Sequence, residues 1–256
     1  MTDNQELTFW DHLDVLRSYL IKMVIAAGAA GIAAFFLKKQ LFAVVLAPKS
    51  SDFITFRLLD TAPFDLQLMN IGLTEQFIIH MKTSTYVGIL AVSPYILFLL
   101  YKFVAPALYR KERHYATRIV GGGYAMFTVG VLLNYFLIFP LTAHFLGTYQ
   151  VSEQVSNMLT LQSYMDTLLM MSLIFGLVFE IPLISWLLAL FGLLKAQWMR
   201  HYYRHAVVAI LIIAAIITPT TDIFTLCLVS LPIWLLYQVS IWIVTFTQRN
   251  KDKENV

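Results

Sequence analysis

The stretch from Leu168 to Leu194 reads LLMMSLIFGLVFEIPLISWLLALFGLL. Glu180 is its one charged residue and lies near the middle. An apolar run of about 18 residues or more is long enough to cross a bilayer, so the stretch predicts a membrane-spanning helix with a carboxylate near its centre. Pro182, two residues later, removes one helical hydrogen bond and leaves a backbone carbonyl one turn back as a second polar group.

A carboxylate at this depth requires a reason. On insertion scales a buried acid costs on the order of 2.5–3.5 kcal/mol, and acids inside membranes usually mark function. On the residues alone two roles stay open for Glu180. It is either a functional group, for example a proton carrier, or a protonated carboxyl that hydrogen-bonds to a neighbouring helix.

The composition fits a membrane protein throughout. The chain has 256 residues, of which 59% are hydrophobic and 13% charged, and its mean hydropathy is +0.72. A soluble domain of this length needs more polar surface to cover its core. The fold class expected is therefore all-α and polytopic. Cys227 is the single cysteine, the histidines are scattered, and no common catalytic or phosphate-binding motif occurs. We expect no enzyme activity, metal site or cofactor, and no nucleic-acid partner.

Hydropathy predicts a single domain, 1–256, with six spans. Residues 1–19 are expected to form an amphipathic helix on the cytoplasmic surface, residues 20–246 to hold the spans with a structured first loop at about 38–77, and residues 247–256 to form a polar tail. The expected spans are about Leu20–Leu37, Ile78–Tyr101, Ile119–Phe145, Leu168–Leu194, Ala206–Thr218 and Phe224–Phe246.

Lysines and arginines set the expected orientation, because cytoplasmic loops carry an excess of them. They gather after the second span, after the fourth span and in the tail, whereas the loops after the third and fifth spans have none. The first loop is an exception, since it holds four. The balance places both termini in the cytoplasm.

The fifth span is short. Thirteen helical residues reach about 20 Å, against a hydrocarbon core of about 30 Å. It ends at Thr218-Pro219, and Asp222 follows. This predicts a locally thinned bilayer; the alternative is that the helix extends back into Tyr202–His205.

Two polar sites are ambiguous when they are read from the residues alone. Asp14 and Arg17 have the spacing of a surface i,i+3 ion pair on the N-terminal helix. Glu112 is the only acid in a basic loop that follows Pro106, and its neighbours could simply neutralise it.

Several segments together resemble the TatC family, the multispanning subunit of the twin-arginine protein translocase. FVAPALYRKER (Phe103–Arg113) is similar to the family's FxAPxLYxxER and is the most specific match. HLDVLR (His12–Arg17) resembles HLxELR, and Ala47-Pro48 resembles a first-loop AP. FGLVFEIP (Phe175–Pro182) resembles FGxxFExP, and TPTTD (Thr218–Asp222) resembles TPxD with one extra residue.

The resemblance implies a cup of six helices that binds signal peptides with consecutive arginines. It places Glu112 where the family has an arginine-binding carboxylate, a role that suits the planar guanidinium. It also implies supporting contacts from Phe103, Pro106 and Arg113, and from Asp14 and Arg17 on the N-terminal helix. Intramembrane polar roles fall to Glu180, Asp222 and Gln238, and structural roles to Pro48, Pro182 and Pro219.

Two residues depart from the family pattern. Val15 stands where the motif has glutamate, and we expect the adjacent Asp14 to replace it. Gln238 stands where the family has a glutamate near the end of the sixth helix, so it keeps hydrogen bonding but loses the charge.

The function expected is therefore that of a Sec-independent twin-arginine translocase subunit. It would bind signal peptides and scaffold the transport of folded proteins across the bacterial inner membrane, driven by the proton-motive force. Expected partners are single-span subunits of the TatA or TatB type, the lipid bilayer and further copies in an oligomeric receptor. The alternative is a proton-coupled small-solute transporter with Glu180 as the proton carrier.

Overall fold

The computed structural model describes residues 9–60, 63–104, 116–150, 152, 157–218 and 222–254. Within these residues the chain is mostly helical, and five segments are long and apolar enough to cross a membrane. They are Leu13–Phe36, Glu75–Phe103, Val120–Thr148, Leu161–Leu190 and Ile223–Arg249, and a sixth apolar helix, Tyr203–Ile217, is shorter. The polytopic all-α class is therefore confirmed, with the six expected apolar segments in their expected order.

The first and last of these segments belong to single long helices. Helix α1 is Phe9–Phe36 and helix α11 is Ile223–Glu254. The N-terminal helix expected over 1–19 is thus continuous with the first span from Phe9 onward, and the polar tail continues the last helix. Helix α4, Glu75–Val104, also runs unbroken and passes through Pro94.

The third and fourth segments are interrupted. The third consists of α5 (Ala116–Leu133), the π-helix η4 (Asn134–Ile138) and α6 (Phe139–Thr148). The fourth consists of α7 (Leu161–Val178) and α8 (Ile181–Leu190). Each interruption precedes a proline, because proline has no N–H to continue the helical ladder.

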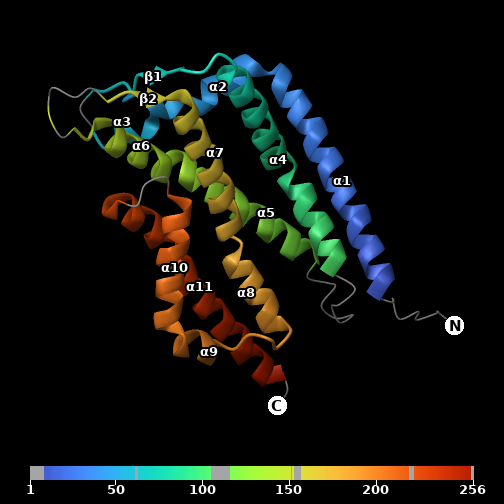
Figure 1. Cartoon of the computed structure of the whole chain (residues 1–256). Coiled ribbons are helices and arrows are strands. Elements are labelled where there is room, and N and C mark those ends of the chain that lie inside the picture. Colours follow the sequence, from blue (N-terminus) through green and yellow to red (C-terminus); the bar gives the residue numbers. More distant parts are fainter. Residues whose placement is uncertain are drawn as a thin grey trace.

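The first loop, which the sequence predicts to be structured, carries several short elements. These are α2 (Lys38–Val45), η1 (Ala47–Lys49), α3 (Ile54–Leu58) and β1 (Leu68–Met69). Strand β1 pairs in parallel with β2 (Leu159–Thr160), which leads directly into α7. In Figure 1 these elements gather at one end of the molecule, above the long helices. They form a cap over that end.

Helix α1 packs along α4 through two glycines. A Cβ placed on Gly88 of α4 would lie 2.4 Å from the backbone nitrogen of Gly31 in α1. No side chain larger than hydrogen fits there, so the two backbones touch at this point. Small residues at a crossing allow such close approach between membrane helices. In Figure 1 the two helices lie side by side along the edge of the molecule.

The cap is tied to the third span at its break. Pro140 cannot donate a hydrogen bond to the carbonyl of Phe136, four residues earlier. The hydroxyl of Thr55, in α3 of the cap, donates to this carbonyl instead. Phe53 strengthens the join, because its ring stacks on Phe136 with centroids 5.7 Å apart. The break in the third span is therefore satisfied by the cap.

The far end of the molecule contains two short helices. Helix α9 is Ala196–His201, and α10 is Tyr203–Ile217 with 15 residues. Helix α10 thus begins at Tyr203, so the fifth span extends back into Tyr202–His205, which is the alternative that the sequence left open. At 1.5 Å per residue it is still only about 22 Å long, which is shorter than a hydrocarbon core of about 30 Å.

Thr55→Val should lower the free energy of unfolding by about 1–2 kcal/mol, because it leaves the Phe136 carbonyl without a donor. Thermal unfolding of the purified protein in detergent would measure the change. Thr83→Val is the matched control. The Thr83 hydroxyl is also buried, but it donates to the carbonyl of Ile79 within its own helix. In the Thr83→Val variant that carbonyl keeps its backbone donor. Equal losses for both variants would contradict the proposed importance of the cap contact.

Candidate functional site

The fourth span is broken directly at Glu180. Helix α7 ends at Val178, and α8 begins at Ile181 with Pro182 in its first turn. Glu180 occupies the cap position of α8, and its own carbonyl accepts from the N–H of Ile184 at 2.9 Å. Because Pro182 has no N–H, the carbonyl of Val178 loses its helical donor. The polar group and the helix break expected from the sequence therefore coincide.

Helix α5 packs closely against α7 just before this break. A Cβ on Gly130 would lie 2.5 Å from the carbonyl oxygen of Phe175, and one on Gly176 would lie 2.6 Å from the ring of Phe127. Each glycine thus leaves room for a phenylalanine of the opposite helix. Gly130 accommodates the backbone of Phe175, and Gly176 accommodates the ring of Phe127. This interlocking fixes the height and rotation of α7 against α5. It also determines which part of α5 the side chain of Glu180 meets.

The carboxylate of Glu180 faces Gly123 of α5. A Cβ at Gly123 would lie 3.3 Å from Oε2 and 3.6 Å from Oε1. The Glu180 side chain is almost fully buried, at 6% exposure. Its Oε1 has no hydrogen-bond partner among the described residues. The site is therefore a polar group enclosed in the seam between α5 and α8.

A buried acceptor without a partner is destabilising, since it has lost its water and gained nothing in return. The fold gives Glu180 no structural task that would compensate for this cost in the described part of the chain. If Glu180 were purely structural, its carboxyl group should form a hydrogen bond with a neighbouring helix. The functional role of the carboxylate stays a prediction, and no hydrogen bond to Oε1 among the described residues supports the structural alternative.

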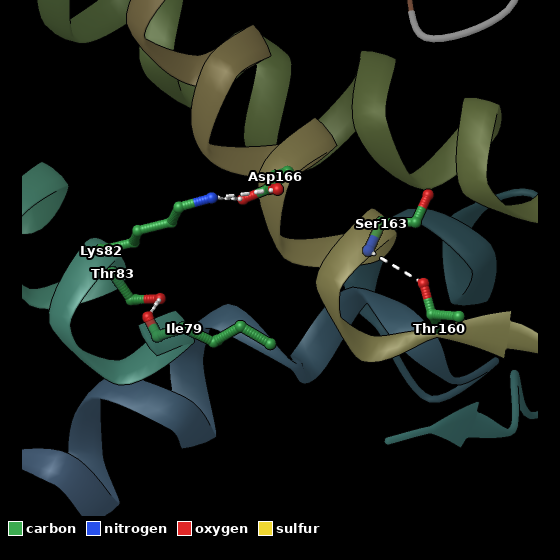
Figure 2. A network of polar contacts seen from close by, with 6 residues as sticks. All are labelled: Ile79, Lys82, Thr83, Thr160, Ser163 and Asp166. Atoms are coloured by element: carbon green, nitrogen blue, oxygen red, sulfur yellow. Dashed lines mark hydrogen bonds and ion pairs between the residues drawn. The ribbon is translucent and has the colours of Figure 1, made fainter. Parts of the chain in front are cut away.

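A second polar contact joins α4 to α7, nearer the cap (Figure 2). The ammonium of Lys82 lies 3.0 Å and 3.2 Å from the two carboxylate oxygens of Asp166. Both side chains are 42% exposed. One turn earlier, the hydroxyl of Thr160 caps α7 by accepting from the N–H of Ser163 at 3.1 Å. The ion pair links the second and fourth spans on an accessible face.

A third contact lies in the core. Asn134 begins the π-helix and is fully buried. Its amide nitrogen donates to the hydroxyl of Ser172 in α7 at 2.9 Å, while its Oδ1 has no partner among the described residues. Asp166, Ser172 and Glu180 thus place polar groups at three depths of the fourth span, each toward a different part of the second and third spans.

The predicted signal-peptide residues are only partly described. Glu112, Arg113 and Pro106 lie outside the described residues, as does Pro219, for which a structural role is predicted. Phe103 lies at the end of α4 and is partly buried. The structure therefore leaves the main predicted binding carboxylate as a prediction.

Asp14 and Arg17 are both exposed near the start of α1, and Val15 is partly buried. The salt bridges found among the described residues are Lys49–Asp65 and Lys82–Asp166. The i,i+3 ion pair considered for Asp14 and Arg17 is therefore not formed in the structure. Asp14 points away from the core and is accessible.

The other predicted polar and structural residues have local partners. Asp222 caps α11, since its carboxylate accepts from the N–H of Thr225 at 2.7 Å, which is a common capping arrangement. Gln238 donates from its amide to the hydroxyl of Tyr203 in α10 at 2.7 Å. Pro48 is buried in η1 of the cap. Gln238 thus forms a hydrogen bond, and its expected intramembrane role stays a prediction.

Sequence reasoning missed Asp166 and Ser172. The expected fourth span begins at Leu168, two residues after Asp166, so hydropathy does not single out Asp166. A signal was present, because Lys82 and Asp166 are opposite charges that each lie inside or beside an apolar run. Ionisable groups in membrane segments commonly pair with one another.

Comparison with known proteins identifies the family. The sequence model of the family described as Sec-independent protein translocase protein (TatC) matches residues 11–232. The chain belongs to the TatC family. It is 32% identical to a TatC protein of Koribacter versatilis, over 97% of this chain and 90% of that protein. It is also 32% identical to a chloroplastic TATC of Arabidopsis thaliana, over 97% of this chain and 69% of that protein.

The fold agrees with a solved TatC structure. A crystal structure described as the twin arginine translocase receptor TatC superposes with a TM-score of 0.79 at 28% identity. The match covers 93% of this chain and 99% of the other. The chain is therefore a multi-pass membrane protein of a protein-transport system, and the resemblance read from its motifs is confirmed.

Glu180→Gln should preserve folding and lower protein transport severalfold, because the amide keeps the shape of the side chain but cannot ionise. Export of a folded reporter and the amount of purified protein would measure the two effects. Glu180→Leu serves as the control for folding, since replacing an unpaired buried polar group by an apolar one is often neutral or stabilising. Unchanged export in Glu180→Gln would show that an ionisable group is not required.

Proposed function

We propose that this protein is the signal-peptide receptor and core scaffold of a twin-arginine translocase in the bacterial cytoplasmic membrane. In this proposal one domain spans the membrane six times with both termini in the cytoplasm. It binds precursor proteins through consecutive arginines in their signal peptides, and transport of the folded precursor is driven by the proton-motive force. The chain itself catalyses no reaction.

The observation that carries the proposal is the superposition on the twin arginine translocase receptor, which extends over almost the whole of both chains. Above 25% identity and at this coverage, the helices of one chain have direct counterparts in the other. The receptor role is named for that protein. It is extended to this chain because the motif FVAPALYRKER, which follows the second span, is present without a gap.

The distribution of charge around Glu112 supports its proposed role in binding arginines. The segment from Lys102 to Arg118 contains five lysines and arginines and a single acid, Glu112. A twin-arginine peptide would be repelled by such a loop unless a carboxylate received it. Glu112 supplies that carboxylate, and a carboxylate pairs with guanidinium through two parallel hydrogen bonds. Two arginines can thereby be distinguished from two lysines, which act as point charges.

The α1–α4 pair supports a contribution from Asp14. The two helices are antiparallel and touch at Gly31 and Gly88. Asp14 lies 17 residues before Gly31, and Phe103 lies 15 residues after Gly88, which correspond to about 25 Å and about 22 Å along the helices. Asp14 and Phe103 therefore reach the same end at nearly the same height. An exposed carboxylate beside the entrance to the Glu112 loop is well placed for a second arginine.

The α10–α11 region supports the docking of single-span partners. Helix α10 exposes Val208, Ile212 and Ile216 on its outer side, and its length falls short of the hydrocarbon thickness. A bilayer that thins around α10 lowers the barrier for a polar segment. We place TatA-type or TatB-type helices along this outer side, and Glu180 as the group that admits polar atoms at mid-depth.

The alternative function, proton-coupled transport of a small solute, uses Glu180 as the carrier. It requires uptake of solute by vesicles that contain only this protein, and no binding of twin-arginine peptides. The two functions are therefore separated by crosslinking a twin-arginine peptide to the 106–113 segment.

Glu112→Ala should weaken binding of a twin-arginine signal peptide by about tenfold or more, since it removes a charge-assisted contact worth about 1.5–3 kcal/mol. Binding of the same peptide with two lysines should change much less. Fluorescence anisotropy with labelled peptides would give both dissociation constants. Equal losses for the two peptides would argue against a bidentate contact.

Asp14→Asn should weaken binding of the twin-arginine peptide severalfold, because the amide keeps the shape of the carboxylate but loses its charge. Asp52→Asn is the control, since Asp52 is also exposed but lies in the cap at the opposite end of α1. If both variants bind like the parent protein, Asp14 does not replace the glutamate that is absent at position 15.

A further inference from the structure

A polar pocket lies between α9, α10 and α11, at the end of the molecule opposite the cap. It has a volume of about 330 Å³ and is lined by Arg200, Tyr203, Gln238, Ile241 and Trp242. It lies beyond the fourth span in the sequence, and Glu180 does not line it. Gln238, for which the sequence predicts an intramembrane polar role, lines it, and the signal-peptide role proposed above does not use it.

The polar groups of this pocket have hydrogen-bond donors to spare. The Tyr203 hydroxyl oxygen lies 2.7 Å from the indole nitrogen of Trp234 and 2.7 Å from the amide nitrogen of Gln238. If both nitrogens donate to the hydroxyl oxygen, the hydroxyl proton and the second amide proton of Gln238 are left to donate to another acceptor. If the amide of Gln238 is turned over, the hydroxyl donates to Gln238, and both amide protons are left over. In either orientation the pair offers two donors to a ligand.

Arg200 adds a positive charge, and no carboxylate among the described residues pairs with it. It donates to the hydroxyl of Thr245 at 3.3 Å, which occupies one of its five N–H groups. Neither salt bridge found among the described residues includes Arg200. The segment from Lys195 to His205 contains no Asp or Glu, although it has three lysines and arginines. The pocket is therefore cationic and rich in donors.

The pocket opens beside an exposed aromatic surface. Trp242 is 71% exposed and stacks with the exposed Phe246. Trp198 and Tyr202 are exposed on the α9 side. Tryptophan and tyrosine concentrate at membrane–water interfaces. A ligand held here thus meets a cationic, donor-rich part and an apolar wall that faces the lipid tails.

We propose that this pocket binds the phosphate headgroup of an anionic phospholipid. The Arg200 guanidinium and the Tyr203–Gln238 pair receive the phosphate oxygens, and an acyl chain lies along Ile241 and Trp242. Guanidinium and spare N–H or O–H donors match phosphate, and basic pockets between spanning helices bind such headgroups. A free phosphate would use only the polar half of the site, so the apolar wall favours the lipid.

The test is native mass spectrometry of the purified full-length protein, titrated with phosphatidylglycerol and with phosphatidylcholine of the same acyl chains. The unmodified chain should bind phosphatidylglycerol more tightly. Arg200→Gln should lower that affinity by about fivefold, which corresponds to about 1 kcal/mol for one basic residue, and should leave phosphatidylcholine binding unchanged. Tyr203→Phe should lower it less, because the amide of Gln238 remains.

Arg204→Gln is the matched control. It removes the same charge four residues away, and Arg204 is exposed but does not line the pocket. Equal losses for Arg200→Gln and Arg204→Gln would overturn the proposal, since they would reflect only general attraction to anionic lipid. Equal affinity for the two lipids would also overturn it. Displacement of phosphatidylglycerol by inorganic phosphate would show a free-anion site and contradict the lipid assignment.

Discussion

The hydrocarbon core of a membrane contains no water that could bond to a free backbone group, so every break in a spanning helix must be satisfied by protein. This requirement shapes the chain at its prolines. The carbonyl released by Pro140 accepts from Thr55 of the cap. The carbonyl of Leu90, four residues before Pro94, accepts from the Ser93 hydroxyl at 2.7 Å. At Pro182 the helix itself stops, and the break is placed beside Glu180. The cap contact, the Ser93 hydrogen bond and the helix end beside Glu180 are three responses to one constraint.

Close contact between backbones makes these responses possible. Gly88 against Gly31, and Gly130 against Phe175, leave no room for a Cβ. Association of helices in lipid depends on such packing, since lipid tails are as apolar as the side chains. Once α5 and α7 are interlocked, the Glu180 carboxylate faces Gly123 of α5. It is thereby held at a fixed depth, apart from the other polar groups of the fourth span.

The local features of the fold follow from the sequence, whereas the contacts between distant segments do not. Apolar runs predict the spans, and Pro182 predicts where the fourth one weakens. The motif around Phe103 predicts the family. By contrast, Thr55 and Phe136 are 81 residues apart, and Lys82 and Asp166 are 84 apart. Their pairing depends on how each helix is rotated about its axis. That rotation is set by glycine contacts that cannot be read from single-residue patterns. Glu180 can therefore be identified from the sequence, whereas its neighbour Gly123 cannot.

The cap contact and three other contacts between distant segments also bear on how the chain enters the membrane during synthesis. Thr55, Lys82, Gly123 and Asn134 all precede the groups that they meet, which are Phe136, Asp166, Glu180 and Ser172. During synthesis the N-terminal parts fold first. The Phe136 carbonyl, Asp166, Ser172 and Glu180 therefore enter the bilayer when the residues that they meet are already in place. Lys82 and Asn134, in contrast, enter before their partners, so during synthesis the wait for a hydrogen-bond partner falls on these two side chains.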